Sequence, residues 1–222
     1  MMRYARVAIV CLVGTLCAGA ASAQTKTPAA TQEFDGYAEI NFGATLGHKS
    51  DKSIGAEAGY HVYTNLDVFV EAGHIGNAAT NEFEAKGQLI ANAVGASVSA
   101  VQKVNYFDVG VRYHLPVSPT PMVHPYVAFG VGAASVKNET VFTVNGAATD
   151  PAALGIQSGT DLNGSLTKAL VMIGFGADVN FKTRYFADVS YRYGHIAAKT
   201  SEIENDVAIS TNRVQVGVGI RF

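Results

Sequence analysis

The chain of 222 residues is 48% hydrophobic and only 15% charged, whereas about 25% of the residues in ordinary soluble domains are charged. Together with a mean hydropathy of +0.16, this composition excludes an intrinsically disordered chain. The formal net charge of −2 argues against a nucleic-acid-binding protein, because neutralising phosphate groups requires an excess of basic residues.

The first 23 residues have the three parts of a secretory signal peptide. Arg3 and Arg6 supply the positive charge at the start, residues 7–16 form a short apolar segment, and residues 21–23 form an Ala-Ser-Ala cleavage site. The apolar segment is shorter than the roughly 20 residues that a membrane-spanning helix needs. We therefore predict that residues 1–23 are a signal peptide that is removed on export.

Residues 24–33 are polar and contain a proline, which predicts a flexible N-terminal segment. The two cysteines, Cys11 and Cys17, lie within the predicted signal peptide. The mature chain is therefore expected to lack disulfides, thiolate metal ligands and a cysteine nucleophile.

From residue 34 to residue 222, apolar and polar residues alternate with a period of two, which is typical of β strands. Strands are expected at residues 34–46, 53–62, 66–73, 106–115, 127–134, 168–181, 185–194 and 213–222. Most of these segments have about the length that a tilted strand needs to cross a bilayer. Residues 34–222 are therefore predicted to form one all-β domain, an eight-stranded antiparallel up-and-down β-barrel.

Alternation alone allows a soluble, lipocalin-like barrel with its apolar face inside, or a transmembrane barrel with its apolar face outside. The apolar faces here hold almost no polar residue, and the other face combines glycine with charged residues, which suits a narrow barrel interior. Aromatic residues also gather at the strand ends, where an interfacial girdle is expected in a transmembrane barrel. These aromatic residues are Phe34, Tyr60, Tyr63, Tyr113, Phe181, Tyr185 and Phe222. We therefore predict a transmembrane barrel.

Charged residues on the polar face are expected to form a salt-bridge network inside the barrel, because unpaired buried charges are costly. The network consists of Glu39, Glu57, Glu71, Asp108, Arg112, Asp178, Asp188, Arg192, Arg213 and Arg221. Within it, Arg192 and Arg213 are expected on adjacent strands and to face Glu39 across the closure of the barrel. The interior of an eight-stranded barrel is only wide enough for side chains, which favours a plugged interior. A weakly conducting pore is the alternative.

The connections between the predicted strands alternate in length. Short connections lie at residues 63–65, 116–124 and 182–184, and longer ones begin at Ala78, Asn138 and Ala197. This asymmetry is typical of outer-membrane barrels, whose longer loops face the outside of the cell. Residues 78–103 contain an apolar run, which is expected to extend the neighbouring strands as a hairpin or to pack as a short helix on the rim. Residues 138–166 are rich in turn signals and are expected to be mobile.

The chain ends in a strand of alternating apolar residues, formed by Val214, Val216, Val218, Ile220 and Phe222. This pattern resembles the C-terminal signature of bacterial outer-membrane proteins, which the barrel-assembly machinery recognises. The segments HPYVAFGVGAASV at 124–136 and FADVSYRYGHI at 186–196 are similar to strands of the OmpA-like and opacity-type eight-stranded barrels. The resemblance implies an integral protein of the bacterial outer membrane that contacts membrane lipid and lipopolysaccharide and is inserted by the assembly machinery.

One motif is similar to an enzyme site. His48-Lys49-Ser50, followed by Asp51, resembles the His-x-Ser pair of the lipid A 3-O-deacylases, but in that family the pair lies on a late strand, whereas here it opens the first loop. The six histidines are scattered along the chain and lack the clustering of metal ligands. We therefore predict a protein that is not an enzyme, without catalytic, cofactor-binding or metal-binding residues.

Loops on a rigid scaffold are where binding usually resides. The sequence therefore predicts a structural envelope role or a surface interaction in which the loops contact a host or surface ligand. A narrow porin-like channel for small solutes is the first alternative, and a lipid A-modifying enzyme is the second.

Overall fold

The computed structural model describes residues 35–117, 120, 122–149, 151–156, 162–198 and 206–222. The predicted signal peptide at 1–23, the predicted flexible segment at 24–33 and Phe34 lie outside the described residues.

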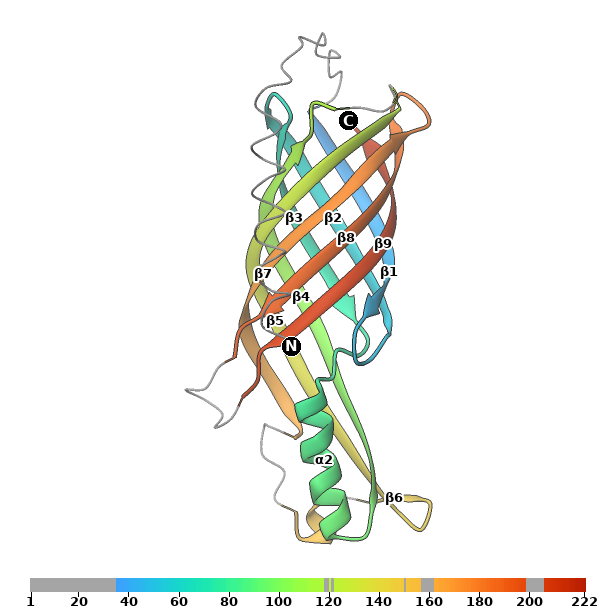
Figure 1. Cartoon of the computed structure of the whole chain (residues 1–222), viewed down its shortest axis with the longest axis vertical. Helices are drawn as coiled ribbons and strands as arrows, with labels where there is room; N and C mark the ends of the chain where they lie inside the picture. The colour runs from blue at the N-terminus through green and yellow to red at the C-terminus, as the bar shows by residue number, and fades with distance from the viewer. Residues whose placement is uncertain (1–34, 118–119, 121, 150, 157–161, 199–205) are drawn as a thin grey trace, which may run out of the picture. The chain divides into compact units, whose positions relative to one another are not determined.

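Eight long antiparallel strands form the wall of a closed barrel (Figure 1). They are β1 (Gly36–Leu46), β2 (Lys52–Tyr63), β3 (Leu66–Ile75), β4 (Ser97–His114), β5 (Val123–Val144), β7 (Gly164–Asn180), β8 (Tyr185–Ile196) and β9 (Ile209–Arg221). Each strand pairs with the next along the chain, and β1 pairs with β9 from Tyr37↔Arg221 to Leu46↔Asn212. This closure confirms the predicted eight-stranded antiparallel barrel. A short ninth strand, β6 (Ala147–Thr149), pairs only with the end of β5.

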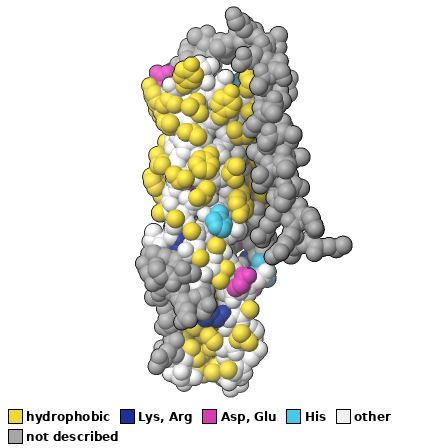
Figure 2. All heavy atoms as spheres, turned by 60° about the vertical axis from the view of Figure 1, so that its left-hand side comes forward, with side chains coloured by type: hydrophobic (Ala, Val, Ile, Leu, Met, Phe, Trp, Pro, Cys, Tyr) yellow, Lys and Arg dark blue, Asp and Glu magenta, His cyan; other side chains and the backbone are white. Residues whose placement is uncertain are grey.

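The apolar faces of the strands point out of the barrel, as predicted for a transmembrane protein. The outward residues Ile40, Val70, Phe107, Ile173 and Val218 are 44 to 60% exposed, and Figure 2 shows hydrophobic side chains spread over one side of the wall. In a bilayer, a closed barrel satisfies every strand hydrogen bond internally while this apolar surface contacts lipid. Within the described ranges, no helix has the length and hydropathy to cross a membrane.

Aromatic side chains ring the barrel end that carries the short turns. The exposed members of the predicted girdle that the structure describes are Tyr60, Tyr63, Tyr113, Phe181, Tyr185 and Phe222. Their place at the ends of β2, β4, β7 and β9 and at the start of β8 corresponds to one membrane interface.

The opposite end of the barrel is more ordered than the sequence predicts. Helix α2 (Asn81–Ala93) begins at Thr80, whose side chain accepts a hydrogen bond from the Phe83 backbone N–H. β4 then starts at Ser97 and pairs with β5 as far as Thr143. The apolar run in residues 78–103 therefore forms both of the expected structures, a helix and a strand extension.

The expectation of a turn-rich, mobile loop at 138–166 is wrong for its first and last parts. Residues 138–144 belong to β5, and β7 already begins at Gly164. The turn signal at Asn145-Gly146 is real, since both residues have positive φ angles of 51° and 82°, but it forms the tight connection between β5 and β6. Thr140 and Phe142 are buried whereas Val141 between them is 48% exposed, so burial alternates along this extension although the polarity of the residues does not.

Candidate functional site

The barrel interior contains a row of four acidic side chains on neighbouring strands. Glu39 on β1 lies opposite Glu57 on β2, Glu57 lies opposite Glu71 on β3, and Glu71 lies opposite Asp108 on β4. All four side chains are buried. They line up because inward residues recur at every second position of each strand and the registers bring these positions to one level.

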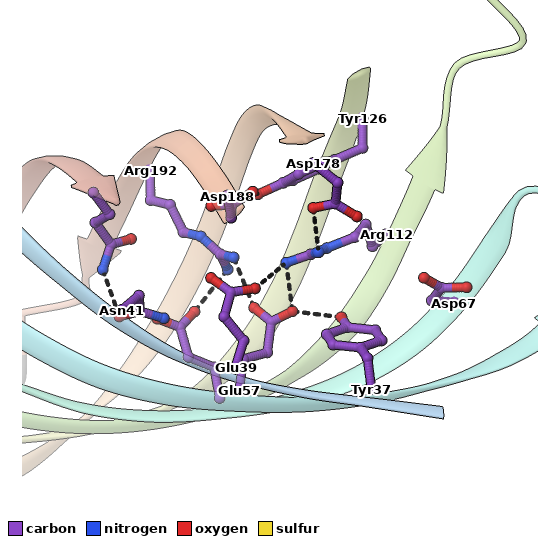
Figure 3. A network of polar contacts seen from close by, with 12 residues as sticks. Tyr37, Glu39, Asn41, Glu57, Asp67, Arg112, Tyr126, Asp178, Asp188 and Arg192 are labelled. Atoms are coloured by element: carbon purple, nitrogen blue, oxygen red, sulfur yellow. Dashed lines mark hydrogen bonds and ion pairs between the residues drawn. The ribbon is translucent and has the colours of Figure 1, made fainter. Parts of the chain in front are cut away.

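Arginines from the facing strands bind the two central acids of this row (Figure 3). Arg192 on β8 donates to Glu57 at 2.7 Å and to Glu71 at 2.7 Å, and Arg112 on β4 donates to Glu57 at 2.6 Å. Tyr37 also donates to Glu57 at 2.5 Å. Such charge-assisted bonds offset the cost of burying each ion only when the partners are in contact.

A second group of charges lies nearer the end with the short turns. Asp178 accepts from Arg112 at 3.4 Å and from Arg221 at 2.9 Å. Asp188 accepts from the Tyr126 hydroxyl at 2.7 Å. Arg112 thus links the two groups of charges, and its guanidinium also stacks 4.1 Å from the centre of the Tyr126 ring.

The structure places all ten charged residues named from the sequence inside the barrel, but it pairs them differently in one respect. Arg213 contacts Glu71 at 3.5 Å and donates to the Tyr106 hydroxyl, whereas the sequence suggested Glu39 as a partner. The ion pair of Glu39 is with Arg112, at 3.6 Å. The tilt of the strands directs Arg213 across the barrel to an acid on β3, two strands away from the expected acid on β1.

Tyrosines and glycines of the interior were missed as parts of this network. Tyr106 donates to Glu71 at 2.8 Å, and its ring lies 4.3 Å from the Arg213 guanidinium. An added Cβ at Gly73 would overlap the Tyr106 ring, and one at Gly59 would overlap the Tyr37 ring. In the sequence, Tyr37 and Tyr106 lie at the alternate strand positions that face inward, and glycines occupy inward positions of the neighbouring strands. This pattern could have predicted that the two tyrosines belong to the network.

Two apolar layers enclose the charged layer. At the end with the long loops, Ile75, Val104, Val136, Leu170 and Ile196 pack together with less than 5% of their surface exposed. Toward the end with the short turns, a second cluster packs against the network, formed by Tyr37, Phe69, Tyr126, Ala128, Met172 and Phe186. The interior is therefore a filled core of apolar and charged layers, and the apolar layer at the loop end was not predicted from the sequence.

The predicted enzyme-like motif is directed toward helix α2. His48 Nε2 lies 2.6 Å from Glu84 Oε2, and Lys49 Nζ lies 2.8 Å from Glu84 Oε1. Partial burial raises the pKa of the Glu84 carboxyl, but the hydrogen bonds from Lys49 and His48 outweigh burial and lower this pKa below its usual range. His48 thus connects the first loop to the helix, and Ser50 is exposed.

Above the membrane, the extended part of the β4–β5 hairpin carries a surface ion-pair cluster. Glu139 on β5 accepts from Lys103 at 2.6 Å and pairs with Lys137 at 2.9 Å, and these two lysines lower the pKa of the Glu139 carboxyl. Within the described ranges, no group of three or more His, Cys, Asp or Glu residues has a geometry suited to a metal ion.

A closed eight-stranded barrel with a lipid-facing apolar wall and a filled, charge-paired interior defines an integral outer-membrane β-barrel protein. The family model of the outer membrane protein beta-barrel domain matches residues 8–222. The chain therefore belongs to this family, as the sequence resemblance implied, and it is located in the bacterial outer membrane.

Solved structures of outer-membrane proteins are similar to this chain at low sequence identity. Neisserial surface protein A is 14% identical, with a TM-score of 0.52 over 85% of this chain and 97% of that chain. Ail, the attachment invasion locus protein of Yersinia pestis, is 14% identical, with a TM-score of 0.47 over 86% of this chain and 99% of that one. OprG of Pseudomonas aeruginosa is 13% identical, with a TM-score of 0.46 over 86% and 97%. The comparison with curated proteins gave no match.

Proposed function

We propose that the barrel is an anchor for an ordered platform outside the cell, and that this platform has a structural envelope role or binds a surface ligand. The observation that carries the proposal is the extension of β4 and β5 beyond the rest of the wall. β3 pairs with β4 only as far as Val104, whereas β4 and β5 stay paired up to Ser97↔Thr143. The hairpin therefore projects by several residues above its neighbours.

Helix α2 supports the projecting hairpin from its inner side. Ala79 and Phe83 pack against Ala100 of β4, and Gly87 of the helix lies where a Cβ would contact the Val98 side chain at 3.4 Å. The hydrogen bond between Glu84 and His48 and the ion pair between Glu84 and Lys49 tie the other side of the helix to the first loop. Ordered loops on a rigid scaffold are suited to binding because little conformational entropy is lost on contact.

Two strains test this proposal. One lacks the gene, and in the other residues 78–102 and 139–163 of the protein are replaced by short turns. We expect the shortened protein to remain a folded barrel, seen as heat-modifiable migration in gels, and to lose the surface binding or envelope phenotype that gene deletion removes. If loop shortening preserves every phenotype that deletion abolishes, the surface-interaction role is wrong and a structural envelope role remains.

The filled interior supports an anchor more than a channel. In planar bilayers the purified barrel is expected to give no discrete conductance steps, and reproducible steps would favour the porin-like alternative. Release of fatty acid from lipopolysaccharide, abolished by His48→Ala or Ser50→Ala, would instead establish the enzyme alternative.

We further propose that β9 carries the assembly signal and that export removes residues 1–23. The outward side chains of Val214, Val216, Val218, Ile220 and Phe222 are exposed, and Phe222 exchanges two backbone hydrogen bonds of 2.9 Å with Gly36. Deletion of Phe222 should lower the amount of folded protein in the outer membrane, whereas Phe181→Ala, at an aromatic position on the same rim, should not. Mass spectrometry of the purified protein should find Gln24 at the mature N-terminus.

A further inference from the structure

The charges inside the barrel do not balance if every group is ionised. Of the charged residues that the structure describes as buried, Asp67 lies beside His61 at 2.8 Å and His114 at 2.9 Å, and Lys168 pairs with Asp206 at 2.6 Å. The central network contains six carboxyl groups, those of Glu39, Glu57, Glu71, Asp108, Asp178 and Asp188, and the guanidinium groups of Arg112, Arg192, Arg213 and Arg221. Two negative charges are therefore in excess. Burying an uncompensated charge in a low-dielectric interior costs several kcal/mol, so a group in this situation usually becomes neutral.

Two of the six carboxyl groups accept no hydrogen bond from the residues that the structure describes. Both oxygens of Glu39 and both oxygens of Asp108 are buried without a partner among the described residues. The nearest cation to Glu39 is the Arg112 guanidinium at 3.6 Å, which is beyond hydrogen-bond distance. By contrast, Glu57, Glu71 and Asp178 each accept from a guanidinium, and Asp188 accepts from Tyr126.

These two groups are the outer members of the acidic row. Glu39 lies directly opposite Glu57, and Asp108 lies directly opposite Glu71. In each opposed pair the arginines hold one carboxylate and leave the other without a donor. Like charges at directly opposed positions of a sheet destabilise it, and the low dielectric of the interior strengthens the repulsion.

The positive charges around both groups are arginines that other carboxylates already bind, and the remaining charged neighbours are negative. Charged groups act on Glu39 from four strands: Arg112 from β4, Glu57 from β2, Asp178 from β7 and Asp188 from β8. The β9 residues directly beside it are Gly217 and Gly219. Asp108 is influenced by Glu71, Glu57, Arg192 and Arg213. Both arginines that act on Asp108 are already engaged by Glu71.

Glycines lie beside both of these carboxyl groups and leave room for them. Glu39 Oε1 lies directly against Gly217, whose missing Cβ makes room for it. A Cβ at Gly130 would be 2.8 Å from Asp108 Oδ1 and 3.2 Å from the Met172 Cε. Closely packed groups therefore lie on this side of each carboxyl group, and a proton is a counter-charge that fits there without displacing them.

We infer that Glu39 and Asp108 are proton-binding sites of the barrel interior. Each holds a proton at neutral pH, so that the remaining four carboxylates balance the four guanidinium groups. The acidic row then consists of two neutral acids flanking two arginine-bound carboxylates.

Infrared spectroscopy of the purified barrel in detergent tests this inference directly. The wild-type protein should show the C=O stretching band of protonated carboxylic acids at pH 7. Glu39→Gln and Asp108→Asn should each remove about half of this band, and the double variant should remove it. Glu57→Gln and Glu71→Gln each remove one of the four balancing carboxylates, so one of the two acids should ionise and the band should also become weaker. Glu82→Gln, on the first turn of helix α2, is the control and should leave the band in place.

Unfolding measurements give a second readout. Glu39→Gln and Asp108→Asn should keep the denaturation midpoint at pH 7, because they replace neutral acids, whereas Glu57→Gln should lower it. Since the folded state holds protons that the unfolded chain releases, the unfolding equilibrium constant of the wild type should rise with pH by up to about tenfold per unit for each proton held. The double variant should lose this dependence.

The absence of the acid band from the wild-type spectrum would overturn the inference even if the variants failed to fold. A band that persists in the double variant would overturn the assignment to these two residues. A midpoint that depends on the sodium or potassium concentration, without an acid band, would show that a cation balances the interior instead.

Discussion

At the scale of single residues, the interior depends on glycines that make room for large polar side chains. Gly73 on β3 leaves the space in which the Tyr106 ring lies, and Tyr106 in turn donates to Glu71. A glycine in a strand weakens it by itself, so its presence is explained by the close approach of another group.

Gly73→Ala should therefore destabilise the barrel by about 1–3 kcal/mol, the usual cost of overpacking a core. The added methyl group would displace Tyr106 from its hydrogen bond. Gly47→Ala is the control, because a Cβ at Gly47 would have no heavy atom within 4 Å. Denaturant titration in detergent would compare the two, and equal midpoints would contradict the proposed role of Gly73.

Arg192 is the residue on which the charged layer depends most, because it donates to both Glu57 and Glu71. Arg192→Ala should lower the free energy of unfolding by about 3–5 kcal/mol, since it leaves buried carboxylates without a counter-charge. Lys182→Ala in the exposed turn between β7 and β8 should change it by less than about 0.5 kcal/mol. Melting of Arg192→Ala at the wild-type temperature would show that other groups compensate.

At the scale of secondary-structure elements, helix α2 is held to the first loop by the Glu84 carboxylate. Because the pKa of Glu84 is lowered in the folded state, the ion pairs stabilise the helix at pH values above the ordinary Glu pKa of about 4.3. This contribution is lost as the pH falls through the lowered pKa.

Amide hydrogen exchange in α2 should therefore be slow at pH 7 and accelerate below about pH 4, relative to the intrinsic rate, while the barrel strands stay protected. Glu84→Gln should show the faster exchange already at pH 7. Glu82→Gln, on the same first turn of the helix, serves as the control. Unchanged protection in Glu84→Gln would mean that packing of Phe83 and Ala91 alone holds the helix.

At the scale of the whole molecule, the lipid-facing wall decides whether the barrel is stable in a membrane. Val216 lies in the middle of β9 and is 55% exposed, so an arginine there would face hydrocarbon. Val216→Arg should cost about 2–4 kcal/mol in a lipid bilayer. Leu89→Arg on α2, where the leucine is 71% exposed beyond the wall, should cost little. Equal folding of both variants in lipid vesicles would contradict the membrane position assigned to β9.

Most of the barrel wall could be predicted because the membrane and the interior impose opposite chemistry on alternate residues of each strand. The extension of β4 was predicted only as one of two alternatives, because Ser97, Val98, Ser99 and Ala100 lie outside the membrane, where both faces of a strand tolerate small residues. Helix α2, which precedes β4, buries few apolar residues, among them Phe83 and Ala91. The spacing of so few residues does not distinguish a helix from a strand.

The interior could be predicted in composition but not in pairing. The alternation of residues along each strand placed Glu57, Glu71 and Arg192 on the inward face. The contacts between these residues depend on the tilt and stagger of the strands. The inward apolar layer has the same cause, because Val104, Val136 and Ile196 lie at one level only after the registers are known.

The seam between β1 and β9 brings the two ends of the domain together, since Gly36 and Phe222 exchange backbone hydrogen bonds. This contact joins residues separated by almost the entire domain, so it has the largest loop-closure entropy of all the strand pairs and is expected to form late. The same proximity makes the domain suited to circular permutation. A permuted chain, with Gly36 and Phe222 linked and new ends opened between Tyr63 and Leu66, would keep seven of the eight strand pairings local in sequence and would exchange the slow seam for a different one.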